Sequence, residues 1–391
     1  MYVIEERYKI NRIILKTLGL WPYQQSYFTQ IHKVLFASIL LTFILAQLLV
    51  FITTQYNTDL LFTILSFVLP VLFATVKYFL FIVETNSLKQ LMEQIRNDWN
   101  SLKDKLEIDI IEKYASNLRL FTISVMAFSY IAVFLFGILQ RLPLILDIIS
   151  PLNESRPYQL FVIKEYFVSQ DKYIQVMMLH EFLVYCIGTI TVYGTGTTIM
   201  TYVTHLCALL KIASYRIENA IERNILAIPN PEKKYLLHQK IVHAVVIHQR
   251  AAEFNEFMTS VFLIPFAILI VVGISSLTCS LYLFFQVITS NNISKAFLIV
   301  ILILAHLTYL FMANYCGQIV LNNGVDLFKA IYNGLWYAAP LSTQKLLLFI
   351  MQRGSVNLNI SCFSIFVASL DGFASLTSTA VSYFTVIYST R

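Results

Sequence analysis

Charged residues are scarce in this sequence of 391 residues, and Asp, Glu, Lys and Arg together make up only 13% of it. In soluble domains these four residue types reach about a quarter of the chain. Hydrophobic residues account for 58%, and the mean hydropathy is +0.69. The composition excludes an ordinary soluble domain and predicts an integral membrane protein.

The sequence also lacks the motifs of catalysis. It has no Gly-x-Ser-x-Gly elbow, no P-loop and no dinucleotide fingerprint. His238, His243 and His248 are spaced by five residues, which does not place them on one helix face, so no metal site is expected. We predict a protein that is not an enzyme and that has no cofactor and no nucleic-acid partner.

A disulfide framework and a cleavable signal peptide are missing as well. All five cysteines lie in or beside apolar segments, which predicts free buried thiols. Residues 1–33 are charged and amphipathic, and no small-residue cleavage site follows the first apolar run. That run is therefore expected to remain as a membrane-spanning helix.

Long apolar segments are what the sequence has in abundance, and each can cross about 30 Å of hydrocarbon, which takes about 20 residues. The seven segments are residues 34–52, 60–83, 118–140, 178–207, 257–288, 296–319 and 361–390. Lys77 lies near one end of the second segment, where its long side chain is expected to reach the membrane surface. Gly194-Thr195-Gly196, inside the fourth, predicts a close helix contact. The fold class is thus all-α with seven transmembrane helices.

The distribution of positive charge predicts the orientation. Of the 28 Lys and Arg residues, twenty fall in segments on one side of these spans and six on the other. Because the positive side stays in the cytosol, the N-terminus is predicted to be cytosolic and the C-terminus extracellular. The sequons at Asn153 and Asn292 then lie in external loops as candidate glycosylation sites.

Apolar residues at helical spacing also occur outside the spans. Residues 88–102 and 208–256 predict membrane helices that continue into a cytosolic anchor. Residues 341–353 predict an amphipathic anchor helix, and Leu347 on it has no obvious partner within one bundle, so we expect it to hold subunits together. The chain therefore divides into a cytosolic segment (1–33), six spans with loops and extensions (34–340), the anchor helix (341–353) and the last span (361–391).

The last span has a polar stripe. Its members recur at spacings of three and four, which is one helix face, and they are Asp371, Ser375, Ser378, Ser382, Val386 and Ser389. A small, hydroxylated stripe avoids lipid, so it faces either another helix or water. Close helix packing and a pore wall both account for the pattern. Asp371 either attracts cations at the inner mouth or pairs with another cytosolic residue.

A few ionisable and aromatic residues inside the spans are candidate site residues. His180, Glu181 and His205 lie near the ends of span four, where a hydrogen bond to a neighbouring helix accounts for Glu181 and His205. An apolar ligand pocket in the outer half of the bundle is one interpretation of a further set, and ordinary packing is the other. This set is Phe67, Val71, Tyr130, Phe134, Tyr185, Thr189, His306 and Tyr309.

Several short motifs give the chain a family resemblance. They are Gly19-Leu20-Trp21-Pro22, Ala330-Ile331-Tyr332-Asn333, Trp336-Tyr337, Pro340-Leu341-Ser342, Ser369-Leu370-Asp371-Gly372-Phe373 and Ser382-Tyr383-Phe384-Thr385-Val386-Ile387. With them the chain resembles the insect odorant receptors. It departs from that family at Asp371 and Gly372, where Glu and Thr are usual. It lacks the long second cytosolic loop of the shared co-receptor, so it resembles an odour-tuned subunit.

The resemblance implies an odorant-gated, non-selective cation channel of four subunits, assembled with the co-receptor in the plasma membrane of olfactory sensory neurons. It implies that a small volatile ligand binds in the outer half of the bundle and that the last span lines the pore. It places the gate at Val386, with Ser389 and Thr390 just outside it, and Ser389 replaces the usual Gln. Two alternatives remain: a gustatory-type ligand-gated channel, and a seven-span receptor without a pore.

Overall fold

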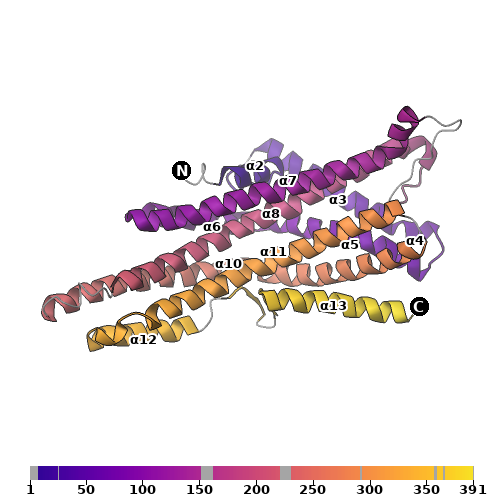
Figure 1. Cartoon of the computed structure of the whole chain (residues 1–391). Helices are drawn as coiled ribbons and strands as arrows, with labels where there is room; N and C mark the ends of the chain where they lie inside the picture. The colour runs from indigo at the N-terminus through magenta and orange to yellow at the C-terminus, as the bar shows by residue number, and fades with distance from the viewer. Residues whose placement is uncertain are drawn as a thin grey trace.

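A computed structural model of the chain describes residues 8–24, 26–150, 162–220, 230–290, 293–355, 359–363 and 366–390. Long helices dominate this part of the chain (Figure 1). The helices are α2 (Lys9–Thr17), α3 (Tyr27–Leu48), α4 (Val50–Thr53), α5 (Thr58–Val83), α6 (Thr85–Ser101), α7 (Lys105–Ile149), α8 (Gln170–Ala220), α10 (Asn230–Thr289), α11 (Ile293–Tyr332), the 3₁₀ turn η1 (Trp336–Ala338), α12 (Leu341–Ser355) and α13 (Leu370–Ser389). Two short antiparallel strands, β1 (Ser361–Cys362) and β2 (Phe366–Val367), precede α13.

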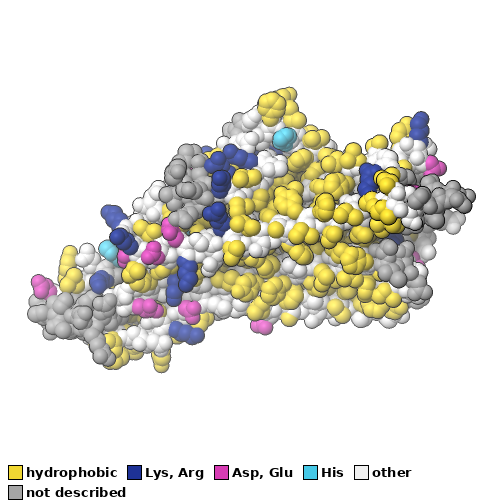
Figure 2. All heavy atoms as spheres, turned by 45° about the horizontal axis from the view of Figure 1, so that its top comes forward, with side chains coloured by type: hydrophobic (Ala, Val, Ile, Leu, Met, Phe, Trp, Pro, Cys, Tyr) yellow, Lys and Arg dark blue, Asp and Glu magenta, His cyan; other side chains and the backbone are white. Residues whose placement is uncertain are grey.

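Within the described residues, six helical stretches are long and apolar enough to cross a membrane. They are Tyr27–Thr53, Thr58–Val83, Lys105–Ile149, Gln170–Ala220, Tyr235–Thr289 and Lys295–Tyr332, and they agree with the first six predicted segments. Figure 2 shows a broad hydrophobic surface over the bundle, with Lys, Arg, Asp and Glu gathered mainly toward one end. This distribution of side chains is that of a multi-pass membrane protein.

The last predicted segment differs from the structure at its start. Ser361–Cys362 and Phe366–Val367 form the paired strands β1 and β2, in which Ser361 pairs with Val367. The helix begins only at Leu370, where the hydroxyl of Ser369 accepts a hydrogen bond from the Gly372 N–H (3.0 Å). The hairpin uses the backbone groups that a helix from residue 361 would need, and the Ser369 cap fixes the later start.

Helix α8 lies at the centre of the bundle and contacts α2, α3, α5, α6, α7, α10 and α11. The predicted close contact at Gly194 is confirmed, because a Cβ there would lie 2.4 Å from Ile14 Cγ2 of α2. Tyr202 and Leu206, farther along α8, are fully buried in the largest core cluster. This cluster joins α2, α5, α6, α7, α8, α10, α11 and α12.

Buried polar groups tie the helix extensions together. Asp98 of α6 accepts from His205 Nε2 (3.0 Å) and pairs with Arg250 Nη1 of α10 (3.0 Å). Arg216 of α8 forms a two-pronged pair with Glu107 of α7, with N···O distances of 2.6 and 2.9 Å. The predicted hydrogen bond from His205 to a neighbouring helix is thus confirmed, and α6 exists as the sequence indicates.

The expectation for Leu347 of α12 is wrong. Its side chain is only 1% exposed and, together with Ile350, belongs to the chain's own core. Helix α12 packs against α10 and α11, which supplies the partner that the sequence alone did not reveal. Leu348 and Phe349 are instead 65% and 58% exposed.

The segment that leads into α8 is held by a buried ion pair. Lys164 Nζ lies 2.6 Å from Glu181 Oε2, and both side chains are fully buried. Tyr166 Oη is 2.6 Å from His180 Nδ1, and the His180 Nε2 atom lies 3.2 Å from the Ile39 carbonyl oxygen. These contacts fasten the segment onto α3 and α8. The sequons at Asn153 and Asn292 lie outside the described residues.

Candidate functional site

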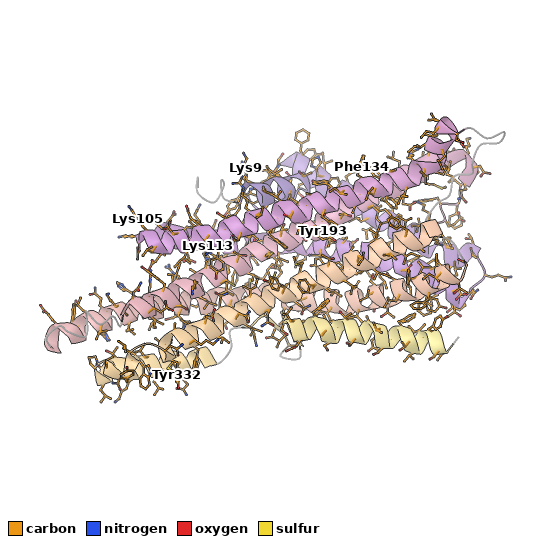
Figure 3. The ribbon with its side chains drawn as sticks, viewed as in Figure 1. Lys9, Lys105, Lys113, Phe134, Tyr193 and Tyr332 are labelled. Carbon is orange, nitrogen blue, oxygen red and sulfur yellow. The ribbon has the colours of Figure 1, made fainter. Side chains whose placement is uncertain are left out.

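A cavity of about 540 Å³ lies between α5, α7, α8, α10 and α11, and the β1–β2 hairpin and α13 close part of it. Its walls are mostly aromatic and aliphatic side chains, such as Phe73, Phe121, Tyr193, Met200 and Phe262. Figure 3 labels Tyr193 in the middle of the bundle. Pockets for small organic molecules typically measure about 300–1,000 Å³ and are mainly apolar, so this cavity suits an apolar small molecule.

Helical periodicity brings the wall residues together. On α7, Phe121, Ser124, Val125 and Phe128 recur at spacings of three and one and share one face. On α8, the corresponding face carries residues 193, 196, 197, 200 and 203. The absence of a side chain at Gly196 leaves room in this wall.

Lys77 of α5 lies directly behind the wall. It is 0% exposed, and its Nζ donates to the Val192 carbonyl oxygen (3.2 Å) and to the hydroxyl of Tyr309, a wall residue. The amino group also lies 4.5 Å from the centroid of the Tyr309 ring. The prediction that Lys77 reaches the membrane surface is therefore wrong, because α8 and α11 enclose its side chain and supply acceptors for it.

Asn314 of α11 joins the cavity to the start of α13. It lines the cavity, and its Oδ1 accepts a hydrogen bond from the Ser369 N–H (3.3 Å). One turn farther on, Gln318 Oε1 accepts from the Leu370 N–H (3.1 Å). The first turn of α13 is thus held by two amide side chains, one of which borders the cavity.

Close backbone packing strengthens this junction. A Cβ at Gly317 of α11 would lie 2.1 Å from the Ala368 carbonyl oxygen. A Cβ at Gly372 would lie 2.6 Å from the Val367 carbonyl oxygen and 2.9 Å from Asn314 Oδ1. A side chain at position 372 would therefore collide with the backbone at Val367 and with Asn314.

Of the eight predicted pocket residues, all described, Tyr309 borders the cavity and the other seven do not. Phe67 and Val71 of α5 belong to a separate apolar cluster with residues of α3 and α8. The ring of Tyr185 packs against Phe136 in a tilted arrangement, with ring centroids 4.3 Å apart. Thr189 is partly buried on α8. Their role as ligand contacts stays a prediction.

The remaining three predicted pocket residues have other surroundings: His306 forms hydrogen bonds within the bundle, and Tyr130 and Phe134 are exposed. His306 Nε2 lies 2.7 Å from Ser276 Oγ, and its Nδ1 lies 2.7 Å from the Leu302 carbonyl oxygen. Tyr130 and Phe134 are 54% and 68% exposed on α7 (Figure 3 labels Phe134). They fall on the side of α7 opposite the cavity, since each residue advances a helix by about 100°.

The polar stripe of α13 points away from the chain's own bundle. Gly372, Leu376, Ala380 and Phe384 are buried against the bundle, where α13 contacts α10 and α11. The stripe residues are all exposed, and they are Asp371, Ser375, Ser378, Ser382, Val386 and Ser389. Thr390, at the end of the helix, is exposed as well. Packing within one subunit therefore does not account for the stripe.

Asp371 lies in the first turn of α13, where the helix dipole favours a carboxylate. It is exposed, and the part of the chain that the structure describes gives it no ion pair. Of its two predicted roles, pairing within the subunit thus finds no support among the described residues.

Sequence reasoning missed Lys77 and Asn314 as site residues. A lysine in the interior of α5, six residues before the helix ends at Val83, was the available signal for the first. For Asn314 the available signal was an amide side chain within a long apolar segment. Its importance depends on the hairpin that packs against it.

A bundle of long apolar helices around an apolar cavity with few polar groups defines a multi-pass membrane protein with room for a small organic molecule. A family model, the 7tm Odorant receptor, matches residues 57–381. The chain therefore belongs to the 7tm odorant receptor family. A comparison with curated proteins finds no match.

Solved structures agree with this fold. The insect olfactory receptor OR5 from Machilis hrabei in complex with eugenol is similar with a TM-score of 0.78 and 15% identity, covering 99% of both chains. A second structure of the insect olfactory receptor OR5 from Machilis hrabei gives a TM-score of 0.72 and 14% identity, again over 99% of both chains. At this identity the likeness establishes the fold. The match to the family ends at residue 381, before Val386.

Proposed function

We propose that this odorant receptor is a subunit of an odorant-gated, non-selective cation channel, with an apolar volatile ligand in the cavity and a pore lined by α13. The observation that carries the proposal is the junction at Asn314, which lines the cavity and accepts a hydrogen bond from the start of α13. A ligand that binds one arrangement of the wall better than another shifts the position of α13. The eugenol complex of OR5 supports a ligand within this fold.

The exposed stripe supports the pore. Serine hydroxyls on a membrane helix are costly in lipid and are stable against water. Four subunits around one axis would place copies of Ser375, Ser378 and Ser382 in rings along a wet path, with Val386 as a dry constriction that closes by dewetting. Asp371 would then face permeating cations at the inner mouth. We infer assembly with the co-receptor in the plasma membrane of olfactory sensory neurons, which immunostaining of those neurons tests.

Co-expression with the co-receptor and exposure to a panel of volatiles tests the channel. We expect a cation current within milliseconds of ligand application that persists when G-protein signalling is blocked, because binding and pore lie in one complex. Cells that express the co-receptor alone are the control. A response that disappears under G-protein block would favour the receptor without a pore.

The orientation is tested with tags at the two ends. An epitope after Arg391 should bind antibody on intact cells, and an epitope before Met1 should bind only after permeabilisation, because the charged end of the bundle faces the cytosol. Surface staining is the measurement. The reverse pattern would contradict the orientation and the pore direction with it.

Exposed aromatic side chains at the charged end of the bundle support assembly through the anchor. Tyr332 of α11, Tyr337 of η1 and Phe349 of α12 are 61%, 65% and 58% exposed (Figure 3 labels Tyr332), and we propose that this part of the bundle lies in the cytosol. Patches of this kind usually meet a partner, and we propose that a neighbouring subunit covers this one.

Phe349→Asp should therefore reduce the complex recovered with the co-receptor by about tenfold while leaving the chain folded, because a charge at an apolar interface costs about 2 kcal/mol or more. Leu347→Asp is the matched comparison and should lower the yield of folded chain itself, since Leu347 is buried in the core. Co-purification and gel-filtration profiles separate the two effects. Undiminished co-purification of Phe349→Asp would argue against this surface as the interface.

A further inference from the structure

The buried amino group of Lys77 has no counter-charge among the residues that the structure describes. Its Nζ donates to two neutral oxygens, the Val192 carbonyl and the Tyr309 hydroxyl. No described carboxylate forms an ion pair with it. Lys164, by contrast, is equally buried and lies 2.6 Å from Glu181 Oε2. A buried charge normally has such a partner. The described surroundings of Lys77 therefore lack the anion that would balance its charge.

The amino group is separated from the cavity by a thin wall. Gly196 and Tyr309 both line the cavity, and a Cβ at Gly196 would lie 3.7 Å from Lys77 Nζ and 3.6 Å from Tyr309 Cε2. Phe73, a third wall residue, has its ring centroid 6.0 Å from the same Nζ. Three residues of one cavity thus surround the amino group, and one of them has no side chain to shield it.

The donors available at this point favour an anion. An ammonium has three N–H donors, and two of the Lys77 donors are used by protein oxygens. The Tyr309 hydroxyl accepts from Lys77 and can donate its own proton to a further group. The third N–H of Lys77 and the O–H of Tyr309 are thus the two donors left at this wall. A carboxylate has two oxygens to accept from them, and charge-assisted hydrogen bonds of this kind are the strong ones.

We propose that this cavity takes a carboxylic acid with an apolar body, bound as its carboxylate with Lys77 as counter-charge and Tyr309 as second donor. The proposal rests on the proposed function only in taking this cavity as the ligand site. The aromatic and aliphatic walls hold the hydrocarbon part, and the Lys77–Tyr309 pair distinguishes the acid from its neutral ester or alcohol. The pair would therefore determine the chemical class of the ligand.

The test measures binding without any current. Thermal unfolding of the purified full chain in detergent micelles is followed at neutral pH with octanoic acid, methyl octanoate and octan-1-ol, and again with the hexanoic and decanoic series. We expect the acids to raise the unfolding temperature more than the matched esters and alcohols. In Lys77→Met, the half-saturating concentration of the acid should rise by about tenfold or more, because a charge-assisted hydrogen bond is lost.

Two glycine variants of α8 keep the proposal testable if Lys77→Met fails to fold. Gly196→Ala adds a methyl group between Nζ and the cavity at ordinary contact distances, so the chain should fold and lose its preference for acids. Gly188→Ala is the matched control, with its Cβ 3.7 Å from Ala74 Cβ and away from Lys77, and it should keep that preference.

Equal shifts by acid and ester in the wild type, or no shift by any acid, would overturn the proposal. An unchanged preference for acids in Lys77→Met, or in Gly196→Ala where Lys77→Met does not fold, would overturn it as well. A chain that prefers acids but carries no current with the co-receptor would leave this inference standing and contradict the proposed channel instead.

Discussion

Val386→Ser should raise the ligand-independent current of the assembled receptor by about tenfold. The Val386 side chain is 60% exposed on the stripe of α13, near the C-terminal end of the helix. In a ring around a pore, its methyl groups would expel water, whereas a hydroxyl holds it. Desolvating a hydroxyl costs about 1–3 kcal/mol, and each 1.4 kcal/mol corresponds to about tenfold in an equilibrium. The closed, dry state therefore loses its advantage in the variant.

Resting conductance at matched surface expression is the measurement, together with the relative permeability to different cations. Val381→Ser is the control, because Val381 is 44% exposed on the same helix but lies about a quarter turn away from the stripe. In a mixed tetramer only the subunits with this chain change, so the effect is partial. A Val386→Ser receptor with wild-type resting current and permeability would show that Val386 is not at a gate.

Gly317→Ala should nearly abolish the ligand-evoked current. The added Cβ would lie 2.1 Å from the Ala368 carbonyl oxygen and 2.5 Å from Ala368 Cβ. The Ala368 backbone is itself held by a hydrogen bond from its N–H to the Ile360 carbonyl oxygen (3.0 Å). The hairpin must therefore move away from α11, at a cost of about 1–3 kcal/mol for overpacking. The start of α13, which is hydrogen-bonded to Asn314, moves with it.

Gly324→Ala is a matched control on the same helix. Nothing lies within 4 Å of a Cβ at Gly324, and an alanine favours the helix by about 1 kcal/mol over glycine. Its evoked current should equal that of the wild type, whereas Gly317→Ala should lose about tenfold or more at equal surface expression. Equal currents in both variants would mean that the hairpin contact does not couple the cavity to α13.

Parts of the site followed from local pattern. The face of α13 that packs inward follows from apolar and small residues at a spacing of four, and the stripe is exposed as a consequence of the same periodicity. Such a pattern is readable because one face differs from the other. On α7 both faces are apolar, so the sequence does not show which face borders a cavity. From the sequence, Tyr130 and Phe134 are predicted to lie there, whereas Phe121 and Phe128 line the cavity in the structure.

Long-range contacts account for the other differences. Leu347 finds its partner in α10 and α11, and Lys77 is enclosed by α8 and α11, which are more than a hundred residues away in the sequence. The pairing of strands β1 and β2 is local, but the place of the hairpin on α11 depends on the close approach of Ala368 to Gly317, about fifty residues earlier in the chain. A short sequence window does not contain both partners of the contacts made by Lys77 or by Gly317.

The sequence by itself determined that this chain crosses the membrane repeatedly, where six of its helices lie, and that its last helix has two unlike faces. Hydrophobic length and helical period are properties of one segment, so neighbouring residues suffice to show them. Only the tertiary structure decided where the cavity lies, that Lys77 is enclosed behind its wall, and that Asn314 joins that wall to α13. These features arise where separate helices meet, and packing between them is fixed by the shapes of side chains far apart in the chain.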